Sequence, residues 1–160
     1  MATGDPIVQI GLFPPNLSSV LWSFLSNLTG DSPPPGKHFG DIKQDITPPK
    51  RGSFRKGDRP SATFWTANPR YDLLTEGTFA SVEMLQGKAW VPTYDDDDFC
   101  LYFKWKQDNS YIYSLATIEW EVPEEASPGT YRLRHFGSSK KTEESPNQYF
   151  TGASSAFTVS

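Results

Sequence analysis

Four consecutive aspartates, Asp95, Asp96, Asp97 and Asp98, are the densest group of metal-ligand residue types in the sequence. Carboxylate oxygens bind calcium, and loops at one end of some β-sandwiches hold it in this way. Calcium takes about six to eight oxygen ligands, so a site here would need oxygens from other loops, which the sequence does not identify. The run is therefore either a calcium loop or a solvated hairpin loop whose like charges keep that end of a sheet soluble.

The residue types that most often carry catalysis are few. The chain has two histidines, His38 and His135, and one cysteine, Cys100. A hydrolytic zinc site normally takes three protein ligands, and the chain has neither HExxH nor a cysteine pair. No second group is spaced to activate Cys100, so we interpret it as a small strand residue. Because G-x-S-x-G, Walker and G-x-G-x-x-G motifs are also missing, we expect this chain to be inactive by itself and to bind no cofactor.

A basic cluster lies in a Pro- and Gly-containing stretch and consists of Lys50, Arg51, Arg55, Lys56 and Arg59. It is either a solvated loop or a patch for phosphates or lipid headgroups. The net charge of the chain is −4, which gives no reason to expect nucleic acid as a partner. The Trp and Tyr side chains could line a sugar-binding face, although strand alternation would bury most of them.

The elements that must position these residues are clearest in 118–137. Apolar residues, Trp120 among them, alternate with polar ones up to Pro123, which predicts a half-buried strand. Pro128 and Gly129 then form a tight turn. A second strand follows, and Tyr131 at its start has the position of a tyrosine corner in an immunoglobulin-like sandwich. An ordinary hairpin arm of another β-fold is the alternative.

The composition favours an all-β domain. Aromatic residues make up 14% of the 160 residues and can supply the core, while 14 Pro and 12 Gly indicate many short elements and turns. One further strand has Phe99, Leu101, Phe103 and Trp105 on a single face. The remaining strand candidates are 61–66, 78–85, 155–159 and 111–115, the last being separate or joined to the strand that ends at Val122. About seven strands predict an immunoglobulin-like antiparallel β-sandwich over 37–160.

Residues 1–36 are predicted to be an N-terminal extension with a short amphipathic helix near 16–28 and a Pro-rich spacer. Its apolar residues recur every three or four positions, Asn16 can cap it and Gly30 can end it. The helix would pack on this domain, on a neighbour or on a lipid surface. Asn16 and Asn27 begin N-glycosylation sequons, which matter only in a secreted protein. With no secretory signal or membrane-spanning segment apparent, we expect a piece of a larger secreted protein or a cytosolic chain.

Several motifs, in collinear order over roughly residues 30–160, resemble the C-terminal domain of the neutral, non-lysosomal ceramidases, especially those of plants. They are Phe39-Gly40-Asp41, Phe54 with Gly57-Asp58, Asn68-Pro69-Arg70, Glu76-Gly77-Thr78-Phe79, Phe103-Lys104-Trp105, 118–137 and 152–159. The resemblance implies an immunoglobulin-like sandwich, in agreement with the strand pattern.

The resemblance also implies a role in sphingolipid metabolism. Neutral ceramidases hydrolyse the amide of ceramide with a zinc ion held by a large N-terminal domain, whose zinc-binding motifs have no counterpart here. The implied function is a non-catalytic accessory domain, with the ceramidase catalytic domain and a membrane lipid surface as partners. For the family, the implied setting is the secretory pathway, the cell exterior or a membrane. A binding module for lipids or carbohydrates, acting on its own, is the alternative from another functional class.

Overall fold

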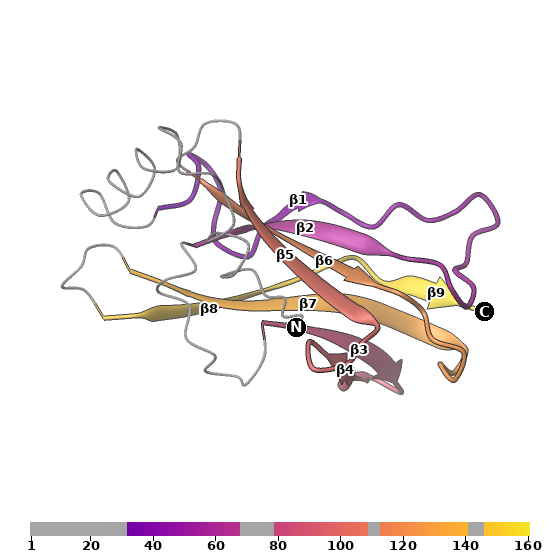
Figure 1. Cartoon of the computed structure of the whole chain (residues 1–160). Helices are drawn as coiled ribbons and strands as arrows, with labels where there is room; N and C mark the ends of the chain where they lie inside the picture. Colours follow the sequence, from indigo (N-terminus) through magenta and orange to yellow (C-terminus); the bar gives the residue numbers. More distant parts are fainter. Residues whose placement is uncertain (1–31, 68–78, 109–112, 141–145) are drawn as a thin grey trace.

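β-Strands are the only regular elements in the described residues of this computed structural model, which are 32–67, 79–108, 113–140 and 146–160. The strands are β1 (Ile42–Gln44), β2 (Ser61–Thr66), β3 (Ala80–Gln86), β4 (Ala89–Asp95), β5 (Leu101–Gln107), β6 (Ser114–Trp120), β7 (Gly129–Ser139), β8 (Gln148–Ala153) and β9 (Phe157–Val159). They form two sheets that lie face to face (Figure 1). The predicted all-β sandwich is confirmed.

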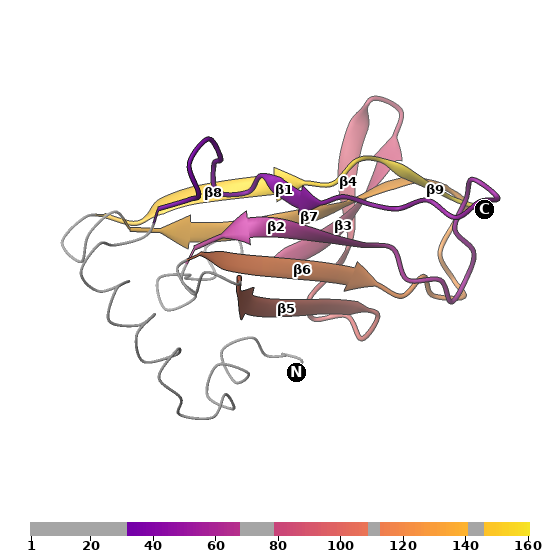
Figure 2. The same cartoon turned by 90° about the horizontal axis from the view of Figure 1, so that it is seen from above.

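The order of the strands is that of an immunoglobulin domain. The first sheet has the order β1-β2-β6-β5, which Figure 2 shows as one layer. The second has the order β4-β3-β7-β8, and β9 also pairs with β7. All strand pairs are antiparallel. The strands of an immunoglobulin domain are lettered A to G along the chain. The first sheet, β1-β2-β6-β5, corresponds to the A-B-E-D sheet of that fold, and the second, β4-β3-β7-β8, corresponds to the C′-C-F-G sheet.

The core is built by alternation along the central strands. On β2, Ala62, Phe64 and Thr66 are buried, and the residues between them are only partly so. Trp120 at the end of β6 is fully buried. Its ring lies 5.0 Å from that of Tyr131 and 5.3 Å from that of Tyr94, both in the opposite sheet. Aromatic side chains thus fill the space between the sheets, as their abundance in the sequence suggested.

A close backbone approach ties the segment before β1 to strand β8. A Cβ atom on Gly152 would collide with the carbonyl oxygen of Gly40, and one on Gly40 with the carbonyl oxygen of Thr151. Gly40 also has a φ of +93°, a conformation that residues with a Cβ rarely adopt. Only glycine therefore fits at these two positions.

The structure contains more strands than the sequence indicated. The candidate strand 111–115 and the strand ending at Val122 join in the described residues, because 114–120 form the single strand β6. Strands β1, β4 and β8 were not predicted. β1 has only three residues, and β4 contains Pro92 beside a register shift in its pairing with β3. A proline inside a run argues against a strand, but it is tolerated at such an edge.

The prediction that Phe99 shares a strand face with Leu101, Phe103 and Trp105 was wrong. Strand β5 begins at Leu101, and the residue Phe99 is 99% exposed. A turn explains the difference, since the amide of Leu101 donates to the carbonyl of Asp98 at 3.1 Å. The alternation of apolar residues extends back to Phe99 in the sequence, but the strand itself begins only at Leu101.

The predicted N-terminal helix near 16–28 and the two sequon asparagines, Asn16 and Asn27, lie outside the described residues. Among the residues that are described, none belongs to a helix long and apolar enough to cross a membrane.

Candidate functional site

The aspartate run forms a tightly hydrogen-bonded loop between β4 and β5. Asp98 Oδ2 accepts from the amide of Asp95 at 2.8 Å, and Asp95 Oδ1 accepts from the amide of Asp97 at 2.9 Å. Asp96 Oδ2 accepts from the amide of Phe79 at 2.9 Å. Within the described ranges, no three His, Cys, Asp or Glu side chains gather as a metal site would require. In this geometry the carboxylates hold the loop in shape.

The two histidines are in opposite environments. The side chain of His38 is 89% exposed, and its amide donates to Asp41 Oδ2 at 2.8 Å. His135 on β7 is fully buried between the sheets. The structure therefore does not bring them together into one site.

His135 joins the two sheets as a neutral side chain. Its Nδ1 lies 3.0 Å from the carbonyl oxygen of Phe79, which can only accept, so Nδ1 carries the proton. Nε2 then accepts from Thr66 Oγ1, 2.9 Å away on β2. Burial lowers the pKa of His135 to about 4, because the charged ring would lose its hydration. The rings of Phe64, Phe103 and Phe150 surround it at 5.6–5.8 Å between centroids.

Cys100 lies next to the aspartate loop and is partly buried. Burial raises the pKa of its thiol, which lowers the fraction of thiolate. The structure thus gives Cys100 none of the activation that a nucleophile needs.

The predicted structural residues lie at the corner between the sheets. Pro128 precedes β7, and Gly129 is its first residue and pairs with Val159 of β9. Tyr131 Oη donates to the carbonyl of Ser127 at 2.6 Å. Strand β7 corresponds to strand F of the immunoglobulin fold. A hydrogen bond from a tyrosine at the start of that strand to the backbone just before it defines a tyrosine corner.

The basic cluster of residues 50–59 does not form one patch. Arg51 pairs with the Asp58 carboxylate, and Lys56 donates to the carbonyl of Ala126. Arg59 pairs with Glu119 at 2.9 Å and with Glu121 at 2.6 Å. Arg51 and Asp58 both lie in the connection between β1 and β2, so their pair braces that connection internally. Lys56 and Arg59 fasten the same connection to the body of the sandwich.

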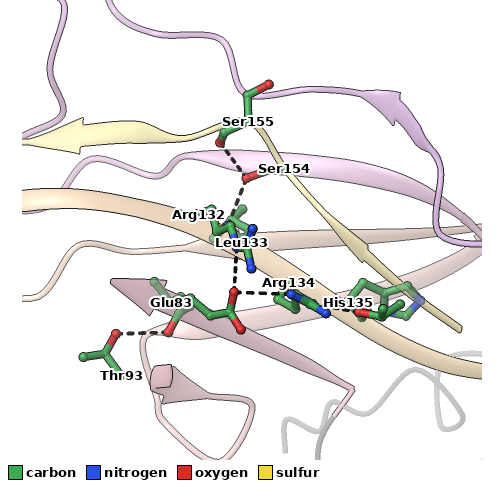
Figure 3. Close-up of polar contacts among 10 residues, drawn as sticks. Glu83, Thr93, Arg132, Leu133, Arg134, His135, Ser154 and Ser155 are labelled. Carbon is green, nitrogen blue, oxygen red and sulfur yellow. Dashed lines mark hydrogen bonds and ion pairs between the residues drawn. The ribbon is translucent and has the colours of Figure 1, made fainter. Parts of the chain in front are cut away.

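A row of side chains that the sequence did not reveal lies across the outer face of the second sheet. We call it the arginine row and define it as Trp90, Arg132, Glu83 and Arg134. Arg132 lies over the Trp90 ring at 4.4 Å, and its Nε donates to Glu83 Oε1 at 2.6 Å. Arg134 Nη1 is 3.7 Å from the same oxygen. Figure 3 shows both arginines reaching toward this carboxylate.

The arginine row is ordered although it faces outward. Only 21% of the Arg132 side chain, 25% of Arg134 and 9% of Glu83 are exposed. Arg134 Nε also donates to Thr151 Oγ1 on β8 at 2.8 Å. Together with Thr151, the row thus connects the four strands β4, β3, β7 and β8. Its two arginines and one glutamate give it one net positive charge. The sequence showed arginines alternating on one strand, but their partner Glu83 depends on the register of β3 against β7, where it faces Arg132.

Large apolar side chains are exposed in a few places of the described chain. Phe99, which directly follows the four aspartates, is 99% exposed, and Tyr149 of β8 is 61% exposed. Tyr102 on β5 is 39% exposed and lies under Arg59.

Comparison with a family model matches residues 1–159 to the family described as "Neutral/alkaline non-lysosomal ceramidase, C-terminal". Similar curated proteins include neutral ceramidase 2 of Arabidopsis thaliana, which is 51% identical over 148 residues. That alignment covers 91% of this chain and 19% of the relative. The neutral ceramidase of Oryza sativa subsp. japonica is 49% identical, with coverage of 91% and 18%.

Solved structures give the same result. The crystal structure of neutral ceramidase from Pseudomonas aeruginosa matches with a TM-score of 0.73 and 32% identity. The match covers 82% of this chain and 21% of that chain. The chain therefore spans about a fifth of the length of these relatives.

Proposed function

Since the chain belongs to the neutral/alkaline non-lysosomal ceramidase family, as its C-terminal domain, we propose that it is a non-catalytic accessory domain of a ceramide amidohydrolase. In this role it packs on the catalytic domain and supports its folding. The observation that carries the proposal is the coverage. Nearly all of the chain matches, but it matches only about a fifth of each relative.

The zinc chemistry of the proposed enzyme is assigned to the catalytic domain. The described residues of this chain do not fit a zinc site, because His38 is exposed, His135 is fully buried and neutral, and no group of three ligands forms among them. The Cys100 thiol is likewise held in its protonated form by burial. This chain therefore contributes surface and stability to the enzyme in our proposal.

Complementation in trans tests this function. The catalytic part of a plant neutral ceramidase, truncated before its C-terminal domain, is expressed alone and together with this 160-residue chain. We expect co-expression to increase the soluble yield of the catalytic part and to let the two polypeptides purify together. An equal soluble yield in both cases, with no co-purification, would refute the accessory role.

The exposed ring of Phe99 favours a second candidate function, which is contact with a lipid surface. An apolar side chain 99% exposed on a hydrogen-bonded loop can enter an apolar phase at low entropic cost. The four adjacent aspartates argue against anionic lipids, since like charges repel. Sedimentation with zwitterionic phosphatidylcholine vesicles tests this candidate. Binding by the wild-type chain that Phe99→Ser abolishes would support it, and no binding would exclude it.

A further inference from the structure

We propose that the outer face of the second sheet is the surface that docks the catalytic domain, and that Arg134 receives a carboxylate of that domain. This inference rests on the proposed function and assigns it to one face and one residue. The expected partner is a protein surface that presents an acidic side chain among apolar residues.

The types of residue in the arginine row are those of binding hot spots. Trp, Tyr and Arg dominate the energetic centre of protein interfaces, whereas Lys and Glu are depleted there. The row contains Trp90 and two arginines, and Tyr149 of β8 is exposed on the same sheet. Such a composition is typical of an interface and not of a sheet face that contacts only solvent.

The order of the row reduces the cost of binding. A flexible arginine loses conformational freedom when an interface immobilises it, and this loss weakens binding. Here Arg132 is already held between Trp90 and Glu83, and Arg134 is already fixed to Thr151. A partner would therefore meet guanidinium groups that are in place before it arrives.

The charge of the row selects an acidic partner. Two guanidinium groups share the single carboxylate of Glu83, which leaves an excess of one positive charge. Arg134 makes one hydrogen bond within the described part of the chain, through Nε, and its Nη1 is too far from Glu83 for another. The terminal nitrogens of an arginine can bind a carboxylate through two parallel hydrogen bonds. Arg134 is thus the residue best placed to receive one.

The outer face of the first sheet is a poorer candidate. Its one described arginine network, Arg59 with Glu119 and Glu121, has two carboxylates for one guanidinium group. Its strand β5 carries the exposed lysines Lys104 and Lys106, a residue type that interface centres avoid. This contrast provides a matched control for the experiment.

The experiment co-expresses the full 160-residue chain with the truncated catalytic part of a plant neutral ceramidase and measures the fraction of the catalytic part that co-purifies. We expect Arg134→Glu to lower this fraction at least about tenfold, because a buried interface carboxylate would face a like charge. Lys104→Glu makes the same charge change on the first sheet and is expected to leave the fraction unchanged. Arg134→Ala, which leaves Glu83 paired with Arg132, serves as a second variant if Arg134→Glu lowers the thermal midpoint of the chain.

The outcomes distinguish the proposed docking face from the proposed accessory function. If the wild-type chain co-purifies and both Arg134 variants do so equally well, the proposed face is wrong while the accessory function stands. If Lys104→Glu alone prevents co-purification, the interface belongs to the first sheet and the inference is again overturned. If the wild-type chain itself does not co-purify, the accessory function fails and this inference fails with it.

Discussion

Tyr131 donates a hydrogen bond from its hydroxyl to the carbonyl oxygen of Ser127, 2.6 Å away. Ser127 lies in the connection between β6, a strand of the first sheet, and β7, a strand of the second. The bond therefore fixes the path by which the chain crosses the sandwich. The ring of Tyr131 is fully buried against Trp120, so the same residue contributes to the corner and to the core.

Replacing Tyr131 by Phe is expected to lower the free energy of unfolding by about 1–2 kcal/mol. The ring stays in the core, but the carbonyl of Ser127 loses its donor. Urea unfolding of the isolated chain measures the effect. Tyr149→Phe, which removes a hydroxyl from a largely exposed residue, is the control and should change stability by less than about 0.5 kcal/mol. Equal effects of both substitutions would show that the corner hydrogen bond does not stabilise the fold.

Stability is expected to fall as the pH drops from 7 to 5 because of His135. The pKa of His135 is about 4 in the folded chain and about 6.5 in the unfolded chain. Between these pH values the unfolded state binds a proton and the folded state does not. The contribution of the neutral His135 to the free energy of unfolding is fully present above about pH 6.5 and is lost as the pH falls toward 4. This site alone should cost about 2 kcal/mol between pH 7 and pH 5, and about 3 kcal/mol by pH 4.

The variant His135→Phe isolates this effect. It is expected to be less stable at pH 7, since Thr66 and the carbonyl of Phe79 lose their partner, but its stability should change less between pH 7 and pH 5. His38→Gln removes the exposed histidine and should keep the wild-type dependence on pH. Urea unfolding at both pH values measures each slope. A slope in His135→Phe as steep as that of the wild type would contradict the account.

Gly152→Ala is expected to destabilise the chain by at least about 2 kcal/mol. The added Cβ would collide with the backbone carbonyl of Gly40. Neither segment is free to move, because the amide of Gly40 donates to the carbonyl of Trp65 at 2.8 Å and Gly152 in β8 pairs with His135. Gly52→Ala is the control, because Gly52 has a φ of +89° and open space around it, so only the conformational penalty of about 1 kcal/mol applies. Thermal denaturation compares the two variants. A smaller loss of stability for Gly152→Ala than for Gly52→Ala would show that the segments are not in close contact.

Two neighbouring apolar residues are expected to respond in opposite ways to substitution by serine. Phe99→Ser removes a fully exposed ring and should change stability by less than about 0.5 kcal/mol. Leu101→Ser places a hydroxyl in the core and should cost at least about 2 kcal/mol. Chemical denaturation distinguishes them. A large loss of stability for Phe99→Ser would contradict the exposure of its ring and indicate that Phe99 packs in the core.

The sequence predicted the features that depend on neighbouring residues. In 118–137, alternation and the Pro-Gly turn located two strands and the residues of the corner, because strand faces and turns are set by local backbone chemistry. Phe99 shows the limit of this approach. Alternation continued past the start of β5, and only the hydrogen bond between Leu101 and Asp98 reveals the turn.

The sequence could not predict features that depend on how distant segments align. Glu83 and Arg132 meet only because β3 and β7 pair in one register. Thr66 and His135 meet only because β2 and β7 face each other across the core. A shift of one residue in either strand would turn these side chains to the opposite face. The arginine row and the contact of His135 with Thr66 therefore became apparent only in three dimensions.

The hydrolysis of a fluorescent ceramide tests the central claim most directly. Turnover is measured for the purified chain, for the catalytic part of a plant neutral ceramidase truncated before its C-terminal domain, and for the two co-expressed. We predict no turnover by the chain alone, little by the catalytic part alone, and the highest activity from the co-expressed pair. Turnover by the purified chain that a chelator abolishes, or equal activity of the catalytic part with and without the chain, would contradict the claim.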